Sequence, residues 1–174
     1  MTDGPQIRTQ VDTVADERSS LREWLDIHRS VLRWKCEGLT PSQMGARPVP
    51  TSSLSLHGLV RHMAAVERYW FRNWVAGEPV ESLYWTEAEP DADFDHVDTA
   101  DWADDLAVWD AEVARARDIE RAENDLDRVC SLEGRPDHDV RWIMVHMIEE
   151  YARHNGHADL IRELVDGATG DGWD

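Results

Sequence analysis

Apolar side chains recur every three or four positions in four long stretches of the chain, with polar residues between them. This period of about 3.6 residues is typical of helices that bury one face. The predicted helices run from about Asp16 to the stop at Gly38, from about Leu56 to Ala76, from Thr99 or Asp101 to about Ala122, and from a cap at Asp137 or Asp139 to Val165. Four amphipathic helices in one short chain predict an all-α fold, a four-helix bundle.

The connections between these helices differ in character. Residues 40–53 contain three prolines and are expected to form a loop, and residues 124–137 form a second loop. Residues 81–99 are acidic and too long for a simple helix–helix turn, but Tyr84, Trp85 and Phe94 indicate that parts of this segment pack back on the bundle. There is no convincing strand, repeat or interdomain linker. We therefore expect a single domain over residues 1–174, with residues 1–14 as a flexible arm, and leave the order of the helices in space open.

Composition narrows the functional classes. The chain has 174 residues, 41% of them hydrophobic and 31% charged, with a formal net charge of −18. Such a charge repels phosphate backbones and anionic lipid, so we expect neither a nucleic-acid partner nor a membrane partner. No stretch approaches the roughly 20 apolar residues that span a bilayer, and the first residues do not resemble a secretion signal. Two cysteines form no disulfide framework, which favours the cytoplasm, and nine tryptophans favour a homodimer.

The chemistry is concentrated in the last predicted helix. Glu150 and His154 lie four residues apart and therefore project from one face, beside an apolar seam that includes Tyr151. His62 lies in the middle of the second helix, so the three side chains can converge if the two helices are neighbours. Two imidazoles and one carboxylate suit a divalent metal and leave positions for water or substrate. The spacing alone does not separate this interpretation from a hydrogen-bonded or solvent-exposed Glu–His pair.

Two segments carry a family resemblance. LSLHGLVRHMAAVERYWF (residues 54–71) resembles the second helix of the DinB/YfiT-like superfamily, and EYARHNGHADLIRE (residues 150–163) resembles its last helix. The actinobacterial DinB-like proteins, which include the mini-circle proteins, are the most similar branch, and with the helix order the resemblance covers nearly the whole chain. It implies a four-helix bundle that binds a divalent metal through His62, Glu150 and His154. Most members have His where this chain has Glu150.

The variant with Glu at this position is similar to the mycothiol-dependent maleylpyruvate isomerases. Those enzymes carry an additional C-terminal domain that this chain, which stops at Asp174, does not have, so that isomerisation is not expected here. The superfamily resemblance implies transferase or isomerase chemistry in which a low-molecular-weight thiol such as mycothiol acts on a small electrophile. Zinc is the favoured metal, with nickel, iron and manganese as alternatives. Trp70, Trp85 or Tyr151 would form the pocket wall.

Neighbouring histidines are expected to support this site. His157 and His146 flank Glu150 and His154 on the same helix, and we interpret them as hydrogen-bonding or packing partners rather than ligands. The competing hypothesis is a protein without enzymatic activity: a metal-binding or dimeric helical bundle that acts in a stress response. A metal with an exchangeable position and an accessible cavity would favour the enzyme, whereas a closed shell of protein ligands would favour a structural metal.

Overall fold

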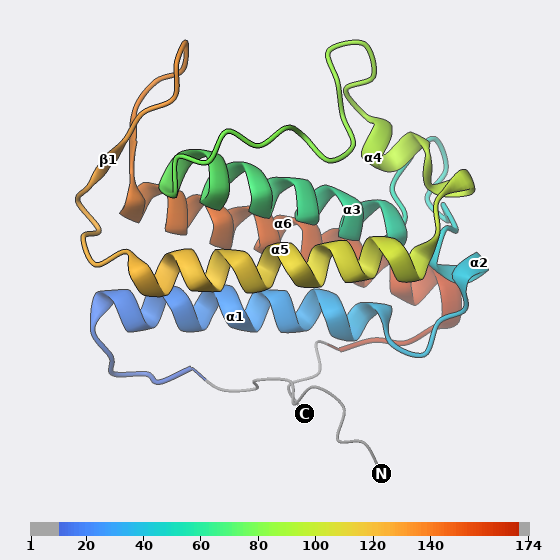
Figure 1. Cartoon of the computed structure of the whole chain (residues 1–174). Helices are drawn as coiled ribbons and strands as arrows, with labels where there is room; N and C mark the ends of the chain where they lie inside the picture. Colours follow the sequence, from blue (N-terminus) through green and yellow to red (C-terminus); the bar gives the residue numbers. More distant parts are fainter. Residues whose placement is uncertain (1–10, 171–174) are drawn as a thin grey trace.

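The computed structural model describes residues 11–170 and confirms the all-α bundle (Figure 1). Its long helices are α1 (Glu17–Cys36), α3 (Leu56–Glu67), α5 (Trp102–Ala122) and α6 (Val140–Asp166). The shorter elements are α2 (Pro41–Met44), the π-helix η1 (Arg68–Val75), α4 (Ala92–Asp95), the 3₁₀ turn η2 (Val97–Thr99), β1 (Val129–Cys130) and β2 (His138–Asp139). Most of the predicted N-terminal arm lies outside the described residues.

Side-chain caps determine where the long helices begin. Asp16, Ser55, Asp101 and Asp139 each have extended backbone and accept a hydrogen bond from a backbone N–H in the first turn of the following helix. These caps satisfy donors that have no partner within the helix. For two helices the sequence left two candidate starting residues, and the structure selects Asp101 and Asp139. The last helix ends at Gly167, whose φ of 81° is the left-handed conformation that glycine adopts without strain.

The long connection before α5 is needed because α3 and α5 run parallel. The residue numbers of contacting pairs increase in the same direction on both helices, from His57–Asp105 to Arg68–Glu112 at the end of α3. The helices α3 and α5 therefore run parallel. A parallel pair needs a return crossing, and residues 76–91 travel back along α3 before α4 and η2 lead into α5 (Figure 1). The α3 and α6 helices run antiparallel, with Trp70 near Trp142 and His62 near His154.

A buried charged network lies among the four long helices. Arg29 of α1 forms two hydrogen bonds with Glu67 of α3, of 2.7 and 2.9 Å, and a third of 2.8 Å with Glu120 of α5. The hydroxyl of Tyr151 from α6 donates to Glu67 at 2.7 Å and accepts from the indole N–H of Trp109 at 3.0 Å. Arg29 and Glu67 are at most 2% exposed, so this network fixes one side chain of every long helix in the interior.

Two local features differ from the sequence expectations. The antiparallel strands β1, in the loop at residues 124–137, and β2, directly after it, pair as Val129–Asp139 and Cys130–His138, where no strand was predicted. The second long helix changes to π geometry from Arg68, and the N–H of Ala76 reaches back five residues to the carbonyl of Phe71. Within residues 11–170, no helix combines the length and the apolar character needed to cross a membrane.

Candidate metal centre

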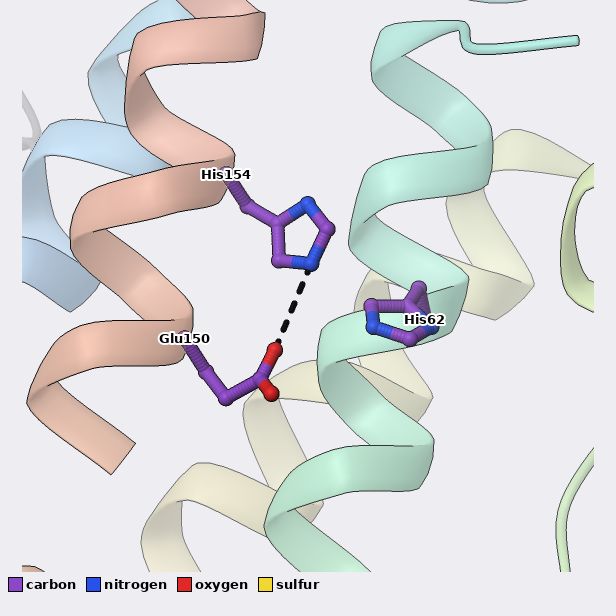
Figure 2. A group of neighbouring side chains, drawn as sticks. All are labelled: His62, Glu150 and His154. Atoms are coloured by element: carbon purple, nitrogen blue, oxygen red, sulfur yellow. Dashed lines mark ion pairs between the residues drawn. The ribbon is translucent and has the colours of Figure 1, made fainter. Parts of the chain in front are cut away.

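His62, Glu150 and His154 meet between α3 and α6. Glu150 and His154 project from successive turns of α6, and His62 faces them from α3 (Figure 2). One potential ligand atom from each residue lies within 4.8 Å of the others, and the two imidazole ring centres are 4.7 Å apart. The structure therefore brings together all three residues that the sequence placed in one site, as the antiparallel packing of α3 against α6 requires.

Asp93 orients His62. Its Oδ2 lies 2.8 Å from Nδ1 of His62, and the carboxylate is buried in α4. Because an ionised carboxylate only accepts hydrogen bonds, Nδ1 is the nitrogen that donates, and in this tautomer Nε2 carries the lone pair. The backbone carbonyl of Asp93 accepts a 2.9 Å bond from Arg61, which attaches α4 to α3. Hydrogen bonds of this kind commonly fix the tautomer of metal-binding histidines.

Sequence reasoning missed Asp93 because it lies in an irregular acidic segment where solvent-exposed carboxylates are expected. The neighbouring Phe94 carried the usable signal, since an apolar residue that packs back brings its neighbours with it. The rings of Phe94 and His62 lie 5.3 Å apart, and Phe94 also packs on Gly58 of α3.

His154 is held on both sides of its ring. Its Nε2 lies 3.4 Å from Oε2 of Glu150, and its Nδ1 lies 3.3 Å from Nδ1 of His157. The hydrogen bond with His154 lowers the pKa of Glu150 below its ordinary value, against the opposing effect of burial. Burial lowers the pKa of His157, with further contributions from His154 and Arg153. A neutral His157 can accept a hydrogen bond from an Nδ1–H of His154, and in that tautomer Nε2 of His154 carries a lone pair for an ion in place of the proton that it shares with Glu150.

An aromatic group adjoins the centre along α6. Trp142 stacks between His138 and His146, with ring centres 4.0 and 4.8 Å away, and Trp70 of η1 meets His146 edge-on at 4.8 Å. Trp70 thus contacts His146, one turn of α6 before Glu150, and its expected role as a pocket wall stays a prediction. Tyr151 is fully buried in the charged network and does not have that role. Trp85 lines a separate cavity of about 130 Å³ with Tyr69 and Asn73.

A larger cavity of about 400 Å³ lies at the start of α5, beside His57 and Trp102. It is connected to the metal centre through hydrogen bonds. His57 and Arg61 both bond Oδ2 of Asp105, at 2.8 and 2.7 Å, and Arg61 in turn holds the Asp93 backbone. Burial would raise the pKa of Asp105, but the hydrogen bonds from Arg61 and His57 lower it.

The donor set fits a divalent metal. Two imidazole nitrogens and a carboxylate oxygen are a ligand set for Zn²⁺ and for Fe²⁺, and three ligands leave positions open. The side chains of His62, Glu150 and His154 retain 25%, 22% and 11% exposure, so solvent reaches the centre. Partial exposure and three ligands together describe a site that can accept a further ligand from solution.

Neither cysteine of the chain is suited to act as the nucleophile. Both are buried, and burial raises the pKa of the Cys36 thiol to about 12 and raises that of Cys130 as well. A thiol with a raised pKa is almost entirely protonated at neutral pH, and the thiolate is the reactive form. Any thiolate that reacts at the metal centre therefore has to come from outside the chain.

Comparison with known proteins gives three findings. A family model described as mycothiol-S-transferase matches residues 20–167. No curated protein matches significantly. Among solved structures, a conserved protein from Enterococcus faecalis is similar with a TM-score of 0.59 at 19% identity, over 89% of this chain and 100% of that one, which is a likeness of fold.

Proposed function

The chain belongs to the mycothiol-S-transferase family within the DinB-like superfamily, and we propose that it catalyses transfer chemistry between mycothiol and a small electrophile with a divalent metal bound by His62, Glu150 and His154. The observation that carries this proposal is the convergence of the three ligand atoms from two helices. The Asp93 hydrogen bond supports it, because that bond leaves Nε2 of His62 available. Zinc is the favoured ion, with nickel, iron and manganese as alternatives.

When bound, the divalent ion supplies Lewis acidity that lowers the pKa of a coordinating thiol, so that a thiolate forms near neutral pH. The chain contributes position and exclusion of water. Asp93 and His157 hold the two imidazoles in place, and Glu150 supplies a negative charge between them. Trp70, beside His146, forms an apolar wall from which water is displaced when a substrate binds. The thiol proton passes to solvent, and the thiolate sulfur forms a bond to the electrophilic carbon. With an alkyl halide the halide departs with the electron pair; with an epoxide the C–O bond breaks, and with an activated alkene the C=C π bond breaks, and the resulting anion takes a proton from solvent.

The test combines metal analysis with turnover. Purified protein would be stripped with chelator, reloaded with Zn²⁺, Ni²⁺ or Mn²⁺, and assayed with mycothiol against alkyl halides, epoxides and activated alkenes. We expect one loaded form to show thiol-dependent turnover and His62→Ala to lose both the metal and the turnover. His96→Ala is the matched control, because His96 is exposed and pairs with Glu89 away from the centre. Full activity in the chelated protein, or no turnover with any metal, would contradict the proposal.

A further inference from the structure

Glu150 faces two imidazoles with two different oxygens. Its Oε2 lies 3.4 Å from Nε2 of His154, and its Oε1 lies 3.5 Å from Nε2 of His146, one turn earlier in α6. A carboxylate that presents one oxygen to each side has the arrangement with which carboxylates bridge two cations. The side of Glu150 that faces His146 is not used by the proposed centre.

A second group of potential ligand atoms surrounds His146, whose Nε2 faces Glu150 and whose Nδ1 faces Glu149, so an ion held by all three residues takes the lone pair of one nitrogen and one carboxylate shifts to reach it. His146, Glu149 and Glu150 each offer one atom within 4.8 Å of the others, and Oε2 of Glu149 lies 3.6 Å from Nδ1 of His146. Arg153 donates a 3.1 Å hydrogen bond to the other oxygen of Glu149. Metal-binding carboxylates are commonly held by such hydrogen bonds, which orient them before the ion arrives.

His146 is fixed in place before any ion binds. Its ring stacks on Trp142 at an interplanar angle of 17°, and the edge of Trp70 closes on it from η1. Helical His–Glu pairs on a surface contribute little to stability by themselves, so they do not explain an imidazole packed between two indoles. A rigid imidazole loses little conformational entropy on binding an ion, which favours a ligand role.

We propose that the chain binds a second divalent ion at His146 and Glu149, with Glu150 shared between the two positions. This inference rests on the proposed function only through Glu150. One imidazole and two carboxylates form a harder ligand set than two imidazoles and one carboxylate, so the second position favours Mn²⁺ or Fe²⁺ more strongly than the first. It binds more weakly, because the Glu149 side chain is 48% exposed and also paired with Arg153.

The experiment measures how many Mn²⁺ ions the full chain binds. Chelator-stripped protein would be titrated with Mn²⁺ by calorimetry and by EPR, and we expect two ions per chain with an exchange-coupled EPR spectrum. His146→Phe keeps the aromatic stack and is expected to reduce binding to one ion, without the coupled spectrum. His138→Phe, on the opposite face of Trp142, is the matched control and is expected to keep two ions. Glu149→Gln alters an exposed residue and is expected to weaken the second ion about tenfold or more without altering the helical circular dichroism.

The outcomes separate the two proposals. One ion in the unaltered chain that His62→Ala removes and His146→Phe leaves would overturn the second position and support the first. Two ions that persist unchanged in both His146→Phe and Glu149→Gln would also overturn it. Absence of any bound Mn²⁺ or Zn²⁺ would contradict both proposals. Loss of one ion in His62→Ala, with the remaining ion sensitive to Glu149→Gln, would support two positions that share Glu150.

Discussion

At the scale of single residues, Asp93 determines which nitrogen of His62 faces the centre. Its carboxylate Oδ2, 2.8 Å from Nδ1, accepts a hydrogen bond from Nδ1–H of His62, and burial in α4 keeps competing water away. An Asn side chain carries both a donor and an acceptor, so Asp93→Asn would remove the charge that favours one tautomer and one ring orientation. We predict that Asp93→Asn weakens metal binding roughly 10–100-fold.

Isothermal titration with Zn²⁺ would measure this change, and circular dichroism would check the fold. Asp95→Asn is the matched control, because Asp95 lies in the same short helix but is exposed. Equal affinities for Asp93→Asn and the unaltered chain would show that Asp93 does not act on His62.

The cysteines give a second prediction at this scale. Burial raises the pKa of Cys36 to about 12 and also raises that of Cys130, so both thiols remain protonated across the neutral range. We expect both cysteines to resist alkylation by iodoacetamide at pH 8 and to react fully once the chain is unfolded in guanidinium. Mass spectrometry with and without denaturant would measure the modification. Rapid labelling of the folded chain would contradict the assignment of both thiols to the interior.

At the scale of elements, the contact between α3 and α4 depends on a glycine. A Cβ added at Gly58 would lie 2.7 Å from Cδ1 of Phe94 and 3.4 Å from the Phe94 Cα, so the Phe94 ring would have to shift and would press on α4. Because α4 carries Asp93, we predict that Gly58→Ala lowers the free energy of unfolding by an amount typical of overpacking, about 1–3 kcal/mol, and weakens metal binding at the same time.

A glycine-to-alanine substitution at Gly156 should instead raise the stability of the chain. Gly156 of α6 is exposed, and a Cβ there would meet nothing within 4 Å. Because alanine is a better helix former, Gly156→Ala should stabilise the chain by roughly 0.5–1 kcal/mol. Chemical denaturation of both variants gives the comparison. Stabilisation by Gly58→Ala would show that α4 does not pack on α3 as described.

The buried network supplies a prediction about α1. Arg29→Met would leave Glu67 and Glu120 in the interior without their cation, and breaking a buried pair in this way costs about 3–5 kcal/mol. Burial raises the pKa of Glu120 even with Arg29 present. Without Arg29, the charged form of this buried carboxylate would be still less stable. Urea denaturation would measure the loss of stability. Arg121→Met is the control, since its pair with Asp118 is exposed and should contribute at most about 1 kcal/mol.

The sequence predicted the long helices well and did not predict the buried charged network, for physical reasons. Apolar periodicity and capping residues are local signals, and they placed the ends of α1, α5 and α6 within a few residues. Short elements such as α4 and β1 have too few residues to show a period. Arg29 and Glu67 occupy polar positions in their helices, and only the packing of four helices makes those positions interior.

At the scale of the whole molecule, the topology explains why the candidate site could be predicted only in part. The spacing of Glu150 and His154 is local to one helix, but the approach of His62 depends on α3 lying antiparallel to α6 (Figure 1). The family resemblance supplied that pairing, whereas periodicity alone left the order of the helices open. Asp93 lies in the segment that connects the parallel helices α3 and α5. No sequence pattern in that segment distinguishes Asp93 from its acidic neighbours. The expected homodimer stays a prediction.

Because the proposed ligands come from two helices, an ion bound there joins α3 to α6 and stabilises the folded chain relative to the unfolded one. Binding to the folded state alone contributes about 2.7 kcal/mol when the free ion is at 100 times its Kd, and each kcal/mol raises the melting temperature of a chain of this length by about 2–4 °C. We therefore predict that chelator lowers the melting temperature of the loaded protein by roughly 5–10 °C, and that excess Zn²⁺ restores it. Scanning calorimetry of the unaltered chain and of His62→Ala would measure the effect. The variant should melt at one temperature with or without the ion, and an equal chelator shift in both proteins would show that the stabilising ion binds away from His62.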